Sequence, residues 1–310
     1  MDDAKGLMTV IAKGLALSIA YCIAYLVLRY YSFDQWFLPA GLRAVCLFFM
    51  PFRYWPFVFI GDAAAVMYGR LSIAAENSLI WVYAGPFLLI AGTSIAPYLL
   101  RKKLIGAQAI CHRLPIAAAG IAAWGGICTV GFNATLGGPS DNATIAFFTT
   151  KFFGNYLGAL MGMLPALIWI NRHQHIGALR KAVRDIALAA TSIAFMFAYL
   201  EYWHDGSDVG RKSILMLMIC PALFLTYRHG WIGAAFGVFI VNVGIAQTMT
   251  YVRTPSSSGP YDESVFLAQI GLSIAASAFL ILGTRITSHY ERAMDAGVAE
   301  KEAKDRKSVV

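Results

Sequence analysis

Residues 265–284 read VFLAQIGLSIAASAFLILGT and contain no Asp, Glu, Lys or Arg. A bilayer core of about 30 Å is crossed by an α-helix of about 20 apolar residues, so this stretch has the length and the composition of one membrane span. The whole chain of 310 residues is 58% hydrophobic and 14% charged, whereas soluble domains are roughly 45–50% apolar and about 25% charged. The sequence therefore predicts an all-α, polytopic integral membrane helical bundle.

Similar apolar runs extend outward from this stretch over most of the chain and predict about eight to ten transmembrane helices. The pair 35–50 and 55–70 is short and carries prolines near its ends, so it forms either two crossings or one re-entrant hairpin. We divide the chain into a membrane-embedded domain, 1–284, and a polar cytoplasmic helical tail, 285–310. The predicted spans are 8–28, 35–50, 55–70, 78–100, 114–130, 144–170, 185–203, 213–227, 230–251 and 265–284.

The distribution of Lys and Arg predicts the orientation, because cytoplasmic loops are enriched in these residues. If both termini are cytoplasmic, 18 of the 25 Lys and Arg residues fall on the inner side and 5 on the outer side, while Arg43 and Lys151 lie well inside spans. We therefore expect a multi-pass protein with its N-terminus and C-terminus in the cytoplasm.

Aromatic and small residues in the spans predict packing features. Glycines recur at every fourth position in 154–162, which lets a second helix approach closely along one face. Aromatic residues near span ends are typical of an interfacial belt. The residues expected in that belt are Trp36, Trp55, Trp81, Trp203, Trp231, Tyr30, Tyr31, Tyr202 and Tyr251.

Several functional classes are disfavoured by the sequence. The formal charge of +8 comes from short loops and the tail, so we expect no nucleic-acid partner. The 5 cysteines occur singly, which predicts inert thiols and neither a metal site nor a cofactor. No nucleophile and base motif is present, so we expect no enzyme activity in this chain. An outer-loop cluster of His204, Asp205 and Asp208 could bind a cation or sense pH, although solvated loop charge is the simpler interpretation.

Charged residues at bilayer depth are costly and are therefore candidate functional residues. Arg43 and Asp62 lie about 15 Å and 14 Å from Arg53 at the predicted hairpin apex, at 1.5 Å per residue, so the two should meet at one depth. Lys151 lies about 10 Å below the outer surface by the same rise, at the level of Arg43.

Two interpretations of this charged layer remain open. In one, Arg43 and Asp62 form an ion pair that locks the hairpin, and Lys151 extends to the interface. In the other, the excess positive charge of the layer binds a small anion, with Asn155 one turn from Lys151 on the same helix face. The ligand or signal candidates are thus Arg43, Asp62, Lys151 and Asn155.

Three motifs carry a resemblance to a known family. The first is Phe37-Leu-Pro-Ala-Gly-Leu-Arg43 with Phe52-Arg-Tyr-Trp-Pro56, the second is Lys151-Phe-Phe-Gly-Asn-Tyr-Leu-Gly158 with Leu164-Pro165, and the third is Tyr227-Arg-His-Gly-Trp231. Together they resemble the bacterial membrane-associated sensor domain of the MASE class, first type, and are similar to the membrane region of sugar-phosphate sensor kinases. We expect the following motif residues of this chain to shape its helices: Pro39, Gly41, Trp55, Pro56, Gly154, Gly158 and Pro165.

This resemblance implies a sensory input domain in a bacterial plasma membrane, as in a two-component system. It would relay an extracytoplasmic or membrane stimulus to a histidine kinase or diguanylate cyclase output module. Membrane lipid, a carrier protein and a second copy of the chain are the other expected partners. No output domain follows the last span, so the chain is either a free-standing sensor or part of a longer protein. The alternative function is a transporter or transporter-associated subunit, because charges at depth also mark substrate paths.

Overall fold

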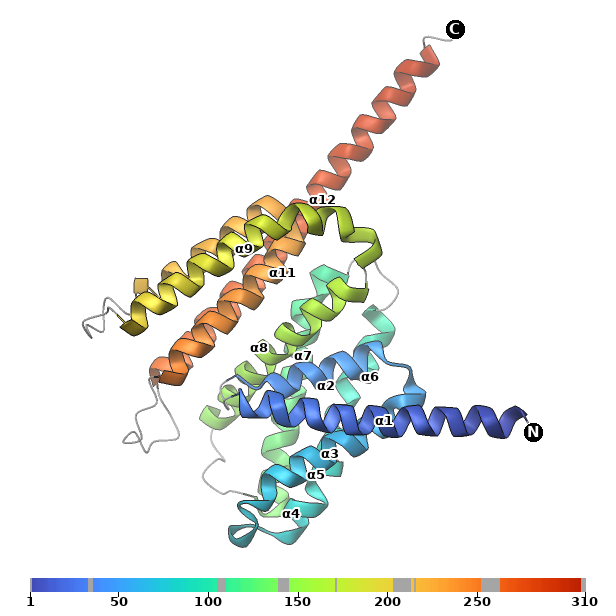
Figure 1. The fold of residues 1–310 in the computed structure, drawn as a ribbon, viewed down its shortest axis with the longest axis vertical. Helices are drawn as coiled ribbons and strands as arrows, with labels where there is room; N and C mark the ends of the chain where they lie inside the picture. The colour runs from blue at the N-terminus through green and yellow to red at the C-terminus, as the bar shows by residue number, and fades with distance from the viewer. Residues whose placement is uncertain are drawn as a thin grey trace. The chain divides into compact units, whose positions relative to one another are not determined.

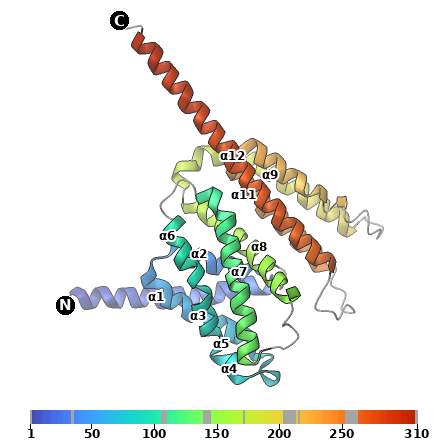
Figure 2. The same ribbon diagram turned by 180° about the vertical axis from the view of Figure 1, so that it is seen from behind.

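The computed structural model describes residues 2–32, 36–104, 110–138, 145–170, 172–202, 213–214, 216–251 and 263–307. The elements in these ranges are helical, as Figures 1 and 2 show from opposite sides. They are α1 (Asp2–Tyr30), α2 (Leu38–Phe49), η1 (Phe52–Tyr54), α3 (Trp55–Leu71), η2 (Ala74–Glu76), α4 (Leu79–Tyr83), α5 (Gly85–Thr93), α6 (Ile95–Leu104), α7 (Ile110–Leu136), α8 (Ile145–Ile170), α9 (Arg172–Tyr202), α11 (Ile219–Tyr251) and α12 (Glu263–Lys307).

The predicted membrane bundle is confirmed, although its helices differ in length. Within the described part of the chain, 6 helices are long and apolar enough to cross a membrane, and Leu38–Phe49 is a shorter apolar helix. The 12 residues of α2 rise about 18 Å, which is less than a bilayer core of about 30 Å. This helix therefore does not cross the membrane by itself.

Two predicted segments differ from the helices observed. The predicted span 78–100 is divided into α4, α5 and α6, and the breaks fall just before Pro86 and Pro97. Proline lacks a backbone N–H and suits the first turn of a new helix, which explains a break at these places. Within the predicted loop 171–184, the described residues 172–184 are instead the first part of α9, because Lys and Arg favour helix.

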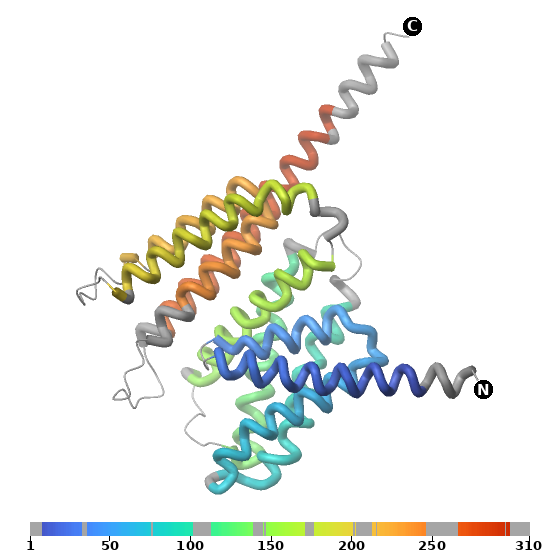
Figure 3. Tube along the Cα trace, in the orientation of Figure 1, coloured from blue at the N-terminus to red at the C-terminus, as the bar shows by residue number. Residues whose placement is uncertain are grey.

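The chain forms two compact units, of which the first comprises residues 1–166 and 260–273 and the second 167–259 and 274–310. Figure 3 traces the path of the chain through these segments. The first unit contains α1 to α7, most of α8 and the start of α12. The second contains α9, α11 and the remainder of α12.

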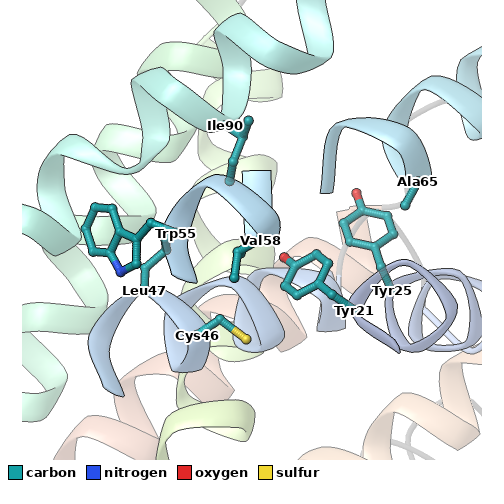
Figure 4. Packing of buried hydrophobic residues seen from close by; sticks show 8 residues of the cluster. All are labelled: Tyr21, Tyr25, Cys46, Leu47, Trp55, Val58, Ala65 and Ile90. Atoms are coloured by element: carbon teal, nitrogen blue, oxygen red, sulfur yellow. The ribbon is translucent and has the colours of Figure 1, made fainter. Parts of the chain in front are cut away.

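The core of the first unit lies between α1, α2, α3 and α5. Its buried members include Tyr21, Tyr25, Leu47, Val58 and Ile90. In Figure 4, the two tyrosine rings point from α1 toward α3 and lie side by side between Val58 and Ala65. The backbones of α1 and α3 lie close together at Gly61, where an added Cβ would lie only 2.6 Å from the carbonyl oxygen of Ser18.

The second unit is organised by a reversal within α11 at Gly230, which has φ +59° and ψ −136°. A side chain on Gly233 would collide with the carbonyl oxygen of Leu225, and one on Gly237 would lie 2.8 Å from Ala222. Residues this far apart touch only if the chain folds back on itself. The predicted break between 213–227 and 230–251 is therefore present, and α11 is a hairpin of two antiparallel helices. The candidate span Ile219–Ile245 contains this reversal and so does not form one straight crossing.

The predicted aromatic belt is wrong for its described tryptophans. Trp36, Trp55, Trp81 and Trp231 are buried among other residues of the chain, whereas Tyr30, Tyr31 and Tyr202 are exposed. Proximity to a span end does not distinguish a ring that faces lipid from one that packs between helices. Trp203 and the side chain of Tyr251 lie outside the described residues.

Candidate functional site

The candidate site is the ion pair between Arg43 of α2 and Asp62 of α3. Nε of Arg43 donates to Oδ1 of Asp62 at 3.1 Å, and Nη2 donates to Oδ2 at 2.9 Å. The Asp62 side chain is fully buried and that of Arg43 is 12% exposed. This two-point geometry is the strongest form of an arginine–carboxylate interaction. The predicted ion pair is thus confirmed.

A third residue completes this charge cluster. The hydroxyl of Tyr21 in α1 donates to Oδ1 of Asp62 at 2.8 Å. Asp62 therefore joins three helices, since α1 supplies one donor and α2 supplies two donors to the carboxylate of α3. An unpaired carboxylate would be expensive in the bilayer core, and each of these donors reduces that cost.

Local sequence explains how the pair is placed. Pro39 lies in the first turn of α2 and Pro56 in the first turn of α3, where proline is tolerated because the missing N–H has no partner within the helix. The short helix η1 connects α2 to α3, so residues at similar distances from it can meet. The guanidinium of Arg101 in α6 donates to the carbonyl oxygen of Met50, just after α2 ends.

The start of α2 packs on α8 through backbone contacts. The N–H of Phe37 donates to the carbonyl oxygen of Gly154 at 3.3 Å. A Cβ on Gly158 would collide with the carbonyl oxygen of Phe37, and one on Gly162 would lie 2.6 Å from the Cα of Gly41. Glycine at every fourth position of α8 therefore forms the predicted close-packing face, with α2 as its partner.

The other two candidates lie on α8. The ammonium of Lys151 lies 5.2 Å from the centre of the Phe147 ring, one turn nearer the beginning of α8. Asn155 faces α7, since its Nδ2 would lie 3.3 Å from a Cβ on Gly125. The hydrogen-bond partners of Asp62 are Arg43 and Tyr21, so the structure joins Arg43 to Asp62 but does not add Lys151 to their pair.

The Gly230 turn is a second polar site, in the other unit. Asp185 of α9 is 5% exposed, and its Oδ2 lies 2.8 Å from Nε2 of His229 and 3.2 Å from Nε of Arg228. Thr287 of α12 accepts the N–H of Trp231 at 3.1 Å and donates to Gly283 at 3.0 Å. The turn therefore connects α9, α11 and α12.

The comparisons with known proteins agree with the motifs at these sites. A family model, MASE1, matches residues 6–289. The chain belongs to the MASE1 family. MASE1 is a membrane-associated sensory domain, which supports a sensor role and a multi-pass location in a membrane. No curated protein and no solved structure matches the chain.

The MASE1 motifs in this chain coincide with its close helix contacts. The first motif supplies Gly41 and Arg43, and the second supplies the glycine face of α8 that receives Gly41. The third forms the turn at Gly230. Pro165 lies within α8 and is exposed. The motif residues thus position helices, and their role in signal detection stays a prediction.

Sequence reasoning missed Tyr21 as a partner of Asp62. The signal was a polar stripe in an aliphatic run, because Ser18, Tyr21 and Tyr25 follow one another at helical spacing and all are buried. Exposed aliphatic residues occupy the other side of α1, for example Ile19 and Ile23. This division into two faces is typical of a helix that meets lipid on one side.

Two basic residues near predicted span ends, Arg70 and Arg228, make polar contacts that loop charge alone does not predict. The Arg70 guanidinium donates to the Trp81 carbonyl oxygen and lies 3.9 Å from the centre of its ring. Trp81 in turn donates to Asn133 at 2.8 Å. Arg228 is one of the 18 basic residues that the predicted topology places on the inner side, and it also forms an ion pair with Asp185. No metal-binding group of three residues occurs in the described ranges, and the predicted cluster of His204, Asp205 and Asp208 lies outside them.

Proposed function

We propose that this MASE1 chain is the input part of a bacterial signalling system in the plasma membrane. It receives an extracytoplasmic or membrane stimulus and passes a change in helix packing to a cytoplasmic output module. A histidine kinase or a diguanylate cyclase is the proposed module, and a carrier protein is a further proposed partner. Catalysis belongs to the output module, and this chain itself is not an enzyme.

The observation that carries this proposal is the continuity of α12. This helix runs from Glu263 to Lys307 without interruption, and it contains the candidate span Phe266–Met294. Its Gly283 and Thr287 contact the Gly230 turn. A continuous helix is stiff along its axis, so a displacement at the turn would be transmitted toward the polar tail.

A transporter is the competing function, and solute uptake distinguishes the two. The purified chain would be reconstituted into proteoliposomes and supplied with labelled sugar phosphates, inorganic phosphate or dicarboxylates. We expect no accumulation against a gradient, because a sensor needs to bind its stimulus and not to move it. Concentrative uptake would contradict the proposed sensor function.

A small anion is the proposed stimulus, because the formal charges at bilayer depth, Arg43, Lys151 and Asp62, sum to a positive value. We expect one of the same anions to raise the melting temperature of the chain in detergent, and Lys151→Gln to reduce that shift. Lys13→Gln is the matched control, since Lys13 is an exposed lysine of α1. If no anion changes the wild-type melt, or if Lys151→Gln responds equally, Lys151 is an interface anchor.

The proposed orientation places both termini in the cytoplasm. We expect reporter fusions at Lys103, Arg180 and Val310 to be active on the cytoplasmic side, and fusions at Gly138 and Ser257 on the outer side. The physical reason is the enrichment of Lys and Arg in the segments assigned to the inside. A cytoplasmic reporter signal at Gly138 would overturn this topology.

A further inference from the structure

The polar cluster beside the Gly230 turn carries an excess of positive charge. The carboxylate of Asp185 is shared by two guanidinium groups, with Nε of Arg228 at 3.2 Å and Nε of Arg184 at 3.7 Å. Nε2 of His229 lies 2.8 Å from Oδ2 of the same carboxylate. One negative charge thus faces two arginines that remain charged at any physiological pH.

Both arginines are also open to their surroundings. The Arg184 side chain is 84% exposed and that of Arg228 is 50% exposed, while the Asp185 side chain is only 7% exposed. Each arginine directs its Nε toward Asp185, and a guanidinium has five N–H donors. Most of their donor capacity is therefore available to a group that approaches from outside the protein.

Exposed apolar side chains lie one helical turn from each arginine. Leu188 follows Arg184 at i+4 on α9 and is 63% exposed, and Phe224 precedes Arg228 at i−4 on α11 and is 44% exposed. The Arg228 guanidinium lies 5.8 Å from the centre of the Phe224 ring. Residues four apart share one helix face, so each helix presents an arginine above an apolar side chain.

On both α9 and α11, the apolar side chain lies on the same side of its arginine along the helix axis. Asp185 of α9 meets His229 at the turn, and Gly244, beyond the turn, meets Ile193 further along α9. These two contacts show that the segment of α11 after the turn runs parallel to α9. The segment before the turn is antiparallel to the segment after it, so it runs antiparallel to α9. Leu188 and Phe224 therefore both lie farther from the Gly230 turn than their arginines do.

We propose that Arg184 and Arg228 bind the headgroup of an anionic phospholipid, whose acyl chain lies along Leu188 and Phe224. The phosphate would accept hydrogen bonds from both guanidinium groups, a geometry that suits arginine better than lysine. Asp185 and His229 hold the two helices together at the site. This lipid site is separate from the Arg43–Asp62 pair and does not depend on the stimulus proposed above.

The apolar residues are the reason to choose a lipid over a soluble anion. A free phosphate would gain nothing from an exposed leucine and phenylalanine beside the arginines. A phospholipid matches both parts, since its charge lies at the membrane surface and its chain lies deeper. The occupant is therefore an amphiphilic anion.

Titration of phosphatidylglycerol into the purified full chain in detergent, followed by native mass spectrometry, tests this site. Each basic residue near an anionic surface contributes enough attraction to change affinity by about fivefold. We expect Arg184→Gln to weaken phosphatidylglycerol binding by about fivefold, and Arg184→Gln with Arg228→Gln by about 25-fold, if the two contributions add. Phosphatidylcholine should bind weakly to all variants.

Arg53→Gln is the matched control, because Arg53 is an exposed arginine of the first unit and should not change phosphatidylglycerol binding. The single variant Arg184→Gln should fold normally because the Arg184 side chain is 84% exposed, so its loss of lipid binding would not reflect misfolding. Equal binding of phosphatidylglycerol by Arg184→Gln and the parent chain would overturn the proposal. Competition by glycerol phosphate at the concentrations at which the lipid binds would also overturn it, because the apolar half of the site would then contribute nothing.

Discussion

We expect Asp62→Ala to lower the free energy of unfolding by about 3–5 kcal/mol, because it leaves the Arg43 guanidinium buried without its counter-charge. Asp62 is fully buried and accepts both hydrogen bonds of the two-point pair. The same change also leaves the Tyr21 hydroxyl without its acceptor. Thermal or denaturant unfolding of the purified chain in detergent measures the effect.

A double-mutant cycle isolates the interaction between the two charges. Asp62→Ala combined with Arg43→Ala should be less destabilised than the sum of the single variants, because no unpaired charge remains. Glu291→Ala is the control, since Glu291 is an exposed carboxylate of α12 and its removal should cost less than about 0.5 kcal/mol. Strict additivity of the two losses would show that Arg43 and Asp62 are not energetically coupled.

Gly158→Ala should be the second strongly destabilising change, with an expected loss of about 3 kcal/mol, at the upper end for overpacking. The added Cβ would collide with the carbonyl oxygen of Phe37. Backbone cannot move aside as a flexible side chain can, so α2 and α8 must separate. Because Arg43 lies on α2, this separation should also weaken the pair with Asp62.

The same substitution in open space provides the matched comparison. A Cβ on Gly131 of α7 has no neighbour within 4 Å, and replacing glycine by alanine inside a helix is favourable by roughly 0.5–1 kcal/mol. Gly131→Ala should therefore be neutral or stabilising while Gly158→Ala destabilises. Gly41→Ala combined with Gly158→Ala should cost less than the sum, since both open one contact. Equal melting temperatures for Gly131→Ala and Gly158→Ala would refute the close backbone contact.

Both predictions bear on the proposed sensor, because α2 carries the glycine contact to α8 and the ion pair to α3. A stimulus that shifts α2 would act on both contacts at once. Structural and sensory roles are then separable by experiment. If a substitution lowers stability without changing the response to an anion, the substituted residue has a structural role. If it changes the response at unchanged stability, the residue has a sensory role.

The sequence alone determined the fold class and the most important charge pair. Long runs without charge, such as 265–284, are incompatible with a soluble core and specify membrane helices. Arg43 and Asp62 were placed at one depth because a helix rises by a fixed distance per residue and both flank one short connection. The glycine face of α8 was likewise predictable, since spacing of four residues defines a face whatever the partner is.

Tertiary structure decided which partners these features meet. Helical periodicity places Tyr21 on a polar stripe of α1, but it does not identify the partner of Tyr21 or of Asp185. A hydrogen bond between residues 41 or 44 positions apart depends on how the helices are arranged. The burial of Trp81 followed from its contacts with Arg70 and Asn133, which no local pattern encodes. In a membrane protein, apolar segments of the sequence become helices because backbone hydrogen bonds must be satisfied within the bilayer. The partner of each polar side chain is fixed only when helices pack, because the chain brings distant donors and acceptors together there.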